Sequence, residues 1–254
     1  AHRWRLPTGV SGNVDFPYFA SRYMLRPQGT SITNGVDGEW GVAGVNDFDD
    51  GSGTTDDISE AGTFGSDDLS IVDPPLLHDV GFAAVMVDAR WPDATRQALE
   101  LAQSAGIPGV VDVDRLPTDL DVLTAASHLV FSEAALTELA GTSDLEAGLR
   151  HAAGRFTGHI SVTSGERGVR WLDDDGAVQH LPAFEVDAVD TTGAGDVFHG
   201  AFALALAEGS TEYDAYRFAA ATAAVKCSRL GARSGIPRRP DVEEFLSVRP
   251  PAPS

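Results

Sequence analysis

The chain has 254 residues, of which 43% are hydrophobic, so it can bury a sizeable core, and a disulfide miniprotein or a disordered tail is excluded. Its 38 Asp and Glu residues against 18 Lys and Arg give a net charge of −20, a field that repels phosphate backbones and anionic lipid. We therefore expect no nucleic-acid partner and no membrane partner.

The composition also bears on the compartment. Cys227 is the only cysteine, so neither an intrachain disulfide nor a multi-thiolate metal site can form, which fits a reducing compartment. No apolar run approaches the roughly 20 residues of a membrane helix, and no signal sequence opens the chain. We expect a cytoplasmic protein. Lys226 is the only lysine.

The first 75 residues differ in composition from the rest of the chain. From Gly29 to Ser70 the sequence is dense in Gly, Asp, Thr and Ser, with few consecutive apolar residues. Because such a segment buries little apolar surface to offset the entropy of ordering it, we predict an atypical, loop-rich N-terminal region over 1–75. A core of regular elements is predicted over 76–248, and 249–254 form a frayed tail.

Short apolar runs alternate with helical patterns from residue 83 onward. The predicted order is strand 83–88, helix 93–105, strand 109–114, helix 120–126, strand 128–131 and a helix capped by Ser132. Strands that alternate with helices at this short range predict an α/β fold, in which a mostly parallel sheet is flanked by helices on both faces.

The pattern changes after Gly158. Strand-like segments at 159–163, 168–172 and 178–182, with a turn at 173–176, predict an antiparallel edge on the parallel sheet. Two long helices are expected at 194–208 and 211–227, and a short one at 241–246.

The turn at 190–196, Asp-Thr-Thr-Gly-Ala-Gly-Asp, lies immediately before an apolar helix. The small residues Gly193, Ala194 and Gly195 let backbone N–H groups converge on an anion at a helix start, where the helix dipole adds favourable potential. Asp196, in the first helical turn, can accept a proton from a hydroxyl that attacks a bound phosphoryl group. Close packing and helix capping alone are the alternative interpretation.

Other nucleotide and catalytic motifs fail on inspection of the sequence. A dinucleotide fingerprint needs a further glycine where Phe198 stands, and a Walker loop needs a Gly-Lys-Ser/Thr run, which Lys226 does not supply. Neither a G-x-S-x-G elbow nor an H-E-x-x-H helix is present.

Three ordered segments carry a resemblance to a known family. Residues 190–196, followed by Phe198, Gly200 and Ala201, resemble the C-terminal signature of the PfkB or ribokinase-like carbohydrate kinases. Residues 163–168 are similar to the family's T-x-G-x-x-G nucleotide motif, and residues 231–237 to its terminal loop. The resemblance covers roughly 76–248 and implies a ribokinase-like fold. Within the family, 87–91, 131–133, 225–227 and the Gly-Ile-Pro loop most resemble the sulfofructose kinase branch.

The resemblance implies transfer of the ATP γ-phosphoryl group to a hydroxyl of a ketose, a ketose phosphate or a sulfosugar, with Mg²⁺ as cofactor. Asp196 would be the base, and the amides of Gly193, Ala194 and Gly195 would stabilise charge on the phosphates. The family comparison also implies a homodimer. The nucleotide-binding residues that it implies are Thr163, Gly165, Gly168, Ser132 and Gly231. Asp190 and Thr192 would bind a monovalent cation such as K⁺.

The chain departs from the family pattern in two places. Where relatives carry Asn-x-x-Glu, this chain reads Ser132-Glu133-Ala134-Ala135, so Mg²⁺ would be held chiefly by ATP oxygens and water, with Glu133 as a substitute ligand. Ser132 is equally a good helix N-cap. The family's sugar-binding Asp, lid and Gly-Gly-x-x-x-Asn segment are not found in residues 1–75.

Charged residues at the predicted strand ends are candidate substrate ligands. Arg90 could clamp a phosphate or sulfonate on the acceptor, or pair with Asp88 or Asp93. Asp112 and Asp114 could contact sugar or magnesium-bound water, or cap the following turn.

Other conspicuous side chains have a structural interpretation. We expect His199 and Cys227 to pack inside helices, and Trp91 and Trp171 to be core or edge aromatics.

Two alternatives to a sugar kinase remain open at this stage. One is a nucleoside kinase of the same fold, because nothing in the sequence identifies the acceptor ring. The other is a degenerate relative that binds a nucleotide without catalysis, because the sugar-binding segments and a magnesium carboxylate are not found.

Overall fold

The structure is a computed structural model of the chain, and it describes residues 3–5, 13–15 and 82–249. Two short strands near the N-terminus, β1 (Arg3–Arg5) and β2 (Asn13–Asp15), pair antiparallel in a sheet of their own. The remainder of the predicted loop-rich region, and residues 250–254 of the predicted tail, lie outside the described residues.

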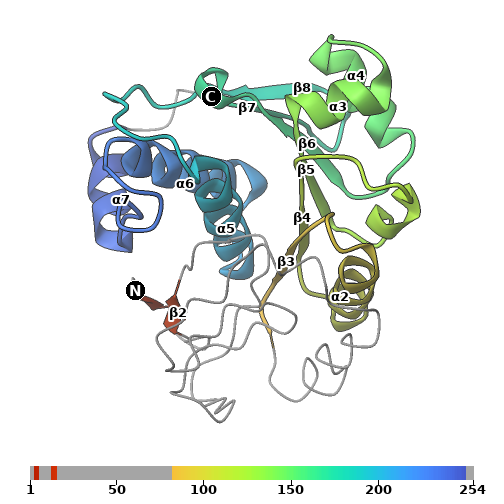
Figure 1. Ribbon diagram of the computed structural model, residues 1–254, viewed down its shortest axis with the longest axis horizontal. Helices are drawn as coiled ribbons and strands as arrows, with labels where there is room; N and C mark the ends of the chain where they lie inside the picture. The colour runs from red at the N-terminus through yellow and green to blue at the C-terminus, as the bar shows by residue number, and fades with distance from the viewer. Residues whose placement is uncertain (1–2, 6–12, 16–81, 250–254) are drawn as a thin grey trace.

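A six-stranded sheet forms the centre of the described chain, with the strand order β3-β4-β5-β6-β7-β8 (Figure 1). Its strands are β3 (Val85–Asp88), β4 (Gly109–Val113), β5 (His128–Ser132), β6 (His159–Thr163), β7 (Val169–Leu172) and β8 (Val178–Leu181). The first four are parallel, and β7 and β8 add antiparallel to β6 and to each other. The prediction of a mostly parallel sheet with an antiparallel edge is confirmed.

Helices cover both faces of this sheet, as Figure 1 shows. On one face lie α2 (Pro92–Ala105), α3 (Glu133–Ala140) and α4 (Leu145–Ala153). On the other lie α5 (Ala194–Ala207) and α6 (Glu212–Cys227), with α7 (Arg239–Ser247) packed on α6. No helix among residues 82–249 has the length and apolar character needed to cross a bilayer.

The helices differ from the sequence prediction in three places. The segment predicted as a helix at 120–126 forms only the 3-10 turn η4 (Leu120–Leu123), because the chain must reach Ser127, whose backbone and side chain bind Gly109 before β5 starts. Helix α4 is absent from the sequence prediction, although Asp144 caps it by accepting from the backbone N–H of residues 146 and 147. Helix α7 begins at Arg239, two residues before the predicted start.

The core has two halves, one on each face of the sheet. Side chains alternate along a strand, so Val110 faces one layer and Val111 the other. The half under α5 and α6 contains Met86, Val110, Val130, Trp171, Phe198, Phe202 and Tyr216. The half under α2, α3 and α4 contains Leu99, Val111, Leu129, Phe131, Leu136 and Leu149. Burial on both faces explains why these strands are continuous apolar runs.

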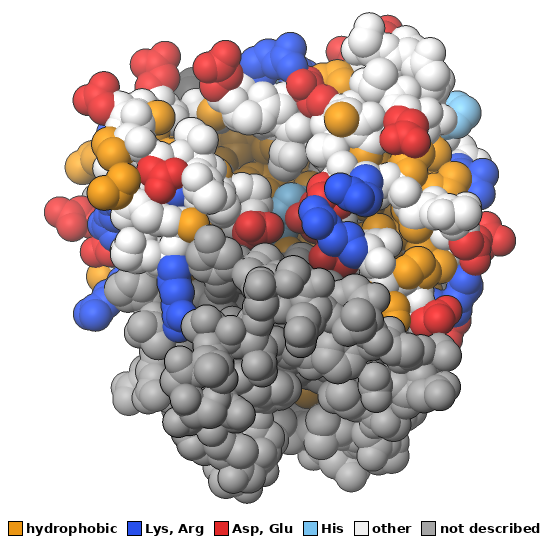
Figure 2. Space-filling view, in the orientation of Figure 1, with side chains coloured by type: hydrophobic (Ala, Val, Ile, Leu, Met, Phe, Trp, Pro, Cys, Tyr) orange, Lys and Arg blue, Asp and Glu red, His pale blue; other side chains and the backbone are white. Residues whose placement is uncertain are grey.

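The same alternation positions the polar groups at the end of the parallel strands, which we call the carboxyl edge. Asp88 ends β3 and pairs in register with Asp112 of β4, two residues beyond the core pair Met86 and Val110. Both carboxylates therefore lie on the face covered by α5. The first turn of α5 meets the carboxyl edge here, at the centre of the view in Figure 2, where acidic, basic and histidine side chains gather.

Candidate active site

The turn before α5 presents backbone N–H groups to open space. Gly193 is the N-cap of the helix with φ 75°, a left-handed conformation that favours glycine. The N–H of Ala194 donates to the Thr191 carbonyl at 3.1 Å, whereas no acceptor among the described residues contacts the N–H of Gly195. A Cβ placed on Gly195 would meet nothing within 4 Å. The turn thus has room for an anion, and the predicted amide donors best suited to it are Gly193 and Gly195.

Asp196 lies beside these amides in the first turn of α5 and is partly buried. One of its carboxylate oxygens, Oδ2, is 3.8 Å from the position that a Cβ on Gly193 would take, so the side chain bends back over the turn. Burial raises the pKa of Asp196, against the lowering effect of His199 and Arg90. A partly buried carboxylate beside open amides has the placement that a general base for an incoming hydroxyl requires.

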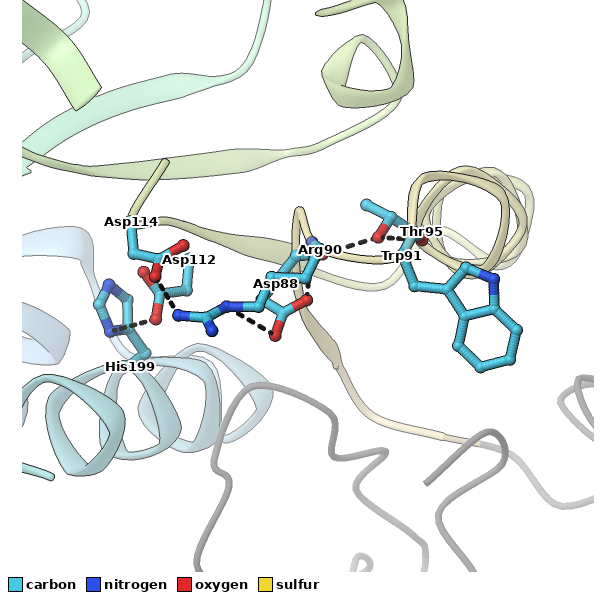
Figure 3. A network of polar contacts seen from close by, with 7 residues as sticks. All are labelled: Asp88, Arg90, Trp91, Thr95, Asp112, Asp114 and His199. Carbon is cyan, nitrogen blue, oxygen red and sulfur yellow. Dashed lines mark hydrogen bonds and ion pairs between the residues drawn. The ribbon is translucent and has the colours of Figure 1, made fainter. Parts of the chain in front are cut away.

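Arg90 and three carboxylates at the ends of β3 and β4 form what we call the Arg90 cluster: Asp88, Arg90, Asp112 and Asp114 (Figure 3). The Arg90 guanidinium binds the Asp114 carboxylate, and its Nε lies 3.8 Å from Asp88 Oδ2. The Arg90 N–H also donates to Asp88 Oδ1 at 2.9 Å. The expected pairing of Arg90 with Asp88 is thus found. Arg90 also pairs with Asp114, a partner that the sequence did not suggest.

A histidine of α5 joins this cluster to the turn. His199 is 4% exposed, as a residue packed inside a helix layer should be. Its Nδ1 donates to the Gly195 carbonyl at 2.7 Å and lies 3.5 Å from Asp112 Oδ2 (Figure 3). Burial raises the pKa of Asp112, and the nearby His199 opposes that rise. Sequence reasoning missed this contact, although the spacing from Asp196 to His199 places both on one side of the helix.

The hydroxyl groups predicted to line the nucleotide lie side by side, since Ser132 at the end of β5 pairs in register with Thr163 at the end of β6. Ser132 Oγ accepts from the Ala135 N–H at 3.2 Å and donates to the Asp114 carbonyl at 3.1 Å, which confirms it as the N-cap of α3. Thr163 Oγ1 donates to the Phe131 carbonyl at 3.4 Å. Their contacts with a nucleotide stay predictions.

The glycines of the next turn lie beyond β6. Gly165 starts the 3-10 turn η5 (Gly165–Arg167), and the N–H of Gly168 donates to its carbonyl at 3.0 Å. Gly168 has φ 85°, and a Cβ there would lie 2.0 Å from the Leu181 carbonyl oxygen. Gly168 is therefore required by the approach of β8, whatever it does for a nucleotide.

The substitute magnesium ligand suggested by the sequence has a protein partner. The Glu133 carboxylate forms an ion pair with Arg167 of η5. Within residues 82–249, no three His, Cys, Asp or Glu side chains converge as a metal-binding group. The described residues therefore fit Mg²⁺ only if ATP oxygens and water supply most of its ligands.

The residues predicted to bind a monovalent cation are brought together at the end of α6. Asp190 Oδ1 accepts from the Thr192 N–H at 2.9 Å, and its Oδ2 accepts from the Gly231 N–H at 2.8 Å. The bonds from Thr192, and then that from Gly231, lower the pKa of Asp190 to about 2. Lys226 also reaches this site, where its Nζ donates to the Asp190 carbonyl at 2.7 Å, a contact that local sequence spacing does not reveal.

The structure also places the tryptophans and the cysteine named in the sequence analysis. Trp171 is buried in the core, with its ring 4.7 Å from that of Tyr216 between centroids. Trp91 is partly buried at the start of α2, and its indole points away from the Arg90 cluster (Figure 3). Cys227 is partly buried at the end of α6, and burial raises the pKa of its thiol.

Comparison with known proteins places these features in a family. Among curated sequences, the ribokinase of Bacillus subtilis is 42% identical over 99 residues, which are 39% of this chain and 33% of that protein. The deoxyribokinase of Salmonella typhimurium is 33% identical over 158 residues, 59% of this chain and 51% of its own length. This chain thus spans between a third and about half of the length of these relatives.

Solved structures show the same fold. The ribokinase of Thermotoga maritima is 29% identical with a TM-score of 0.61, covering 70% of this chain and 60% of that one. The Arabidopsis thaliana ribokinase complexed with ribose and ATP is 27% identical with a TM-score of 0.60, covering 72% of this chain and 59% of that one. The family model described as pfkB family carbohydrate kinase matches residues 76–239. With the mixed sheet and the glycine turn before α5, this match shows that the chain belongs to the pfkB family of carbohydrate kinases.

Proposed function

We propose that this chain transfers the γ-phosphoryl group of ATP to a hydroxyl group of a sugar. The observation that carries the proposal is the position of Asp196, whose carboxylate lies beside the open amides of the turn before α5. A base and an anion-binding turn are thereby adjacent at the edge where parallel sheets bind ligands. The ribokinase similarity supports the same reaction, and the plant relative is complexed with ribose and ATP.

The protein's part in this reaction is positioning and electrostatics. ATP would supply the phosphoryl group, and Mg²⁺ held by its phosphates would screen their charge. The amides of Gly193 and Gly195 and the N-terminal end of α5 would hold the negative charge of the phosphoryl oxygens. Asp196 would accept the proton of the acceptor hydroxyl. His199 would keep the turn in place through its bond to the Gly195 carbonyl.

The nucleotide would bind along the ends of β5 and β6. Ser132 and Thr163 lie there as register neighbours, and the 3-10 turn with Gly165 and Gly168 follows β6 directly. Gly231 is tied to the turn before α5 through Asp190, so it would border the same site. We propose that all five residues contact the nucleotide, which is the role that the family resemblance implies for them.

The charge at the carboxyl edge favours an uncharged acceptor. Among the described residues, the carboxylates of Asp88, Asp112 and Asp114 lie around Arg90, and Asp196 is close enough for its pKa to respond to Arg90. An anionic group on the acceptor would meet more negative than positive charge there. A ketose therefore fits the described residues better than a ketose phosphate or the sulfosugar implied by the sulfofructose kinase resemblance.

This acceptor preference gives the experiment that tests the function. The full chain is incubated with ATP and Mg²⁺ and either ribose, deoxyribose, fructose, fructose phosphate, sulfofructose or adenosine. ADP release and the phosphorylated product are followed by ³¹P NMR. We expect acceptor-dependent ADP release, with a higher kcat/KM for uncharged sugars than for sulfofructose or fructose phosphate.

Other outcomes of this assay have defined meanings. Turnover with adenosine alone would identify a nucleoside kinase, and ATP binding without turnover would identify a nucleotide-binding relative. If sulfofructose is the best acceptor, and Arg90→Ala lowers its kcat/KM by roughly tenfold or more, Arg90 is an anion clamp and the preference for an uncharged acceptor is wrong.

The pH dependence of the reaction provides a separate prediction. Burial raises the pKa of Asp196 above the ordinary value of 3.8, and a general base works only when deprotonated. We therefore expect kcat/KM to rise with pH through this raised pKa and to level off above it. Arg90→Ala removes a charge that lowers the pKa of Asp196, so it should move the acid limb to higher pH. An unmoved limb in this variant would show that Asp196 is not the titrating base.

A further inference from the structure

The chain's only lysine is buried at the point where α6 meets the turn before α5. Lys226 is 0% exposed in the last turn of α6. Its Nζ donates to the Asp190 carbonyl at 2.7 Å and lies 3.8 Å from Asp190 Oδ1. A buried ammonium group is costly unless oxygen atoms compensate its charge, and here one aspartate residue supplies them.

The oxygens of Asp190 all have donors within the protein. Its carbonyl accepts from Lys226, its Oδ1 from the Thr192 N–H and its Oδ2 from the Gly231 N–H. A monovalent cation held by Asp190 and Thr192 would displace these donors or lie next to the fixed ammonium, where like charges repel. The residues predicted to bind K⁺ therefore do not fit that ion.

We infer that the ammonium group of Lys226 takes the place of the monovalent cation, so that the fold carries this positive charge in its own chain. The ammonium holds the carbonyl of Asp190, the first residue of the turn that ends at Asp196. Through the Asp190 carboxylate the same contact reaches Gly231 in the terminal loop. Lys226 is thus a positioning residue for the turn, and only the use of that turn in catalysis rests on the proposed function.

Backbone hydrogen bonds hold residues 189 and 190 against α6 without the Lys226 side chain, so a variant that lacks its charge can test the inference. The N–H groups of Val189 and Asp190 both donate to the Cys227 carbonyl, at 2.8 and 3.1 Å. These bonds do not involve the lysine side chain, so the segment stays attached to α6 when that side chain is shortened. Lys226→Ala then leaves a small space beside the Asp190 carbonyl, where a free cation can bind.

The experiment measures thermal unfolding of the full chain at constant ionic strength. Tetramethylammonium chloride is replaced stepwise by KCl, NH₄Cl or ethylammonium chloride. We expect the Tm of the wild-type chain to be the same in all four salts. Lys226→Ala should have a lower Tm that rises by roughly 3–6 °C when K⁺, ammonium or ethylammonium reaches ten times its Kd.

Two control variants distinguish charge replacement from a general salt effect. Lys226→Met fills most of the lysine volume without charge, so it should show less recovery than Lys226→Ala. Arg239→Ala removes a second cation, 24% exposed, which pairs with Glu208 at the C-terminal end of α5, and small cations should not restore its Tm selectively.

The inference is overturned if K⁺ raises the Tm of the wild-type chain above its value in tetramethylammonium. It is also overturned if no small cation restores Lys226→Ala selectively. Should Lys226→Ala not fold, the wild-type comparison alone decides. These measurements need neither acceptor nor turnover, so a failed kinase assay would refute the proposed function and leave this result standing.

Discussion

Asp196→Asn is expected to lower the rate of phosphoryl transfer by about 10²–10⁴-fold, the usual contribution of a general base, while ATP affinity stays nearly unchanged. The amide has almost the shape of the carboxylate but cannot accept the proton of the acceptor hydroxyl. The turn that would bind the phosphates is built from backbone groups and is untouched by the change. Steady-state kinetics with the best acceptor and calorimetric titration of ATP measure the two effects separately.

Asp93→Asn is the matched control for this variant. Asp93 also lies in the first turn of a helix, α2, but is exposed and faces solvent. The same chemical change there should leave kcat within the error of the assay. Comparable rate losses in both variants, or an unchanged rate in Asp196→Asn, would remove Asp196 from its role as base.

Gly168→Ala is expected to destabilise the chain by about 3–5 kcal/mol, an exceptional loss for a single methyl group. The backbone at this position has φ 85° and ψ −146°, a region that is almost confined to glycine. The new Cβ would lie 2.0 Å from the Leu181 carbonyl oxygen and 2.7 Å from the Ala183 nitrogen, both backbone atoms that cannot swing aside. Urea unfolding monitored by circular dichroism gives the free energy of unfolding.

Gly165→Ala provides the comparison within the same turn. Gly165 also has a positive φ, 55°, but a Cβ on it would meet nothing within 4 Å. Only the cost of the left-handed conformation remains, about 1–2 kcal/mol. Equal losses in the two variants would show that backbone conformation, and not the approach of β8, sets the requirement for glycine at 168.

The secondary structure was largely predictable because its signals are local. The apolar runs of β3, β4 and β5 are buried on both faces, and the helices α5 and α6 follow turns that the sequence marks clearly. The failures have a physical cause as well. Residues 120–126 have a helical pattern, but the chain must join β5 within a few residues, so only a 3-10 turn forms. Helix α4 was predictable in principle, because Asp144 is a residue type that commonly caps helices and does so here.

The candidate site likewise has a part that could be predicted from local sequence and a part that could not. The glycine turn and Asp196 are contiguous in sequence, so their adjacency required no knowledge of the fold. The contacts that surround them join distant segments: Arg90 and Asp114 are 24 residues apart, and Lys226 and Asp190 are 36 apart. The order of the strands and the packing of α6 beside the turn bring these groups together, and neither can be read from local spacing.

The sequence by itself therefore determined the α/β class, the helix that begins at the glycine turn, and the position of the carboxylate that we propose as the base. Those features depend on periodicity and on neighbouring residues in the chain. Only the tertiary structure decided that Arg90 is bound by Asp88 and Asp114, that His199 bridges Asp112 and the Gly195 carbonyl, and that the Lys226 ammonium binds the Asp190 carbonyl. His199 and Lys226 are held by protein groups because burial removes the water that would otherwise bind them. Arg90 stays exposed, and its pairs with Asp88 and Asp114 follow from the pairing of β3 with β4.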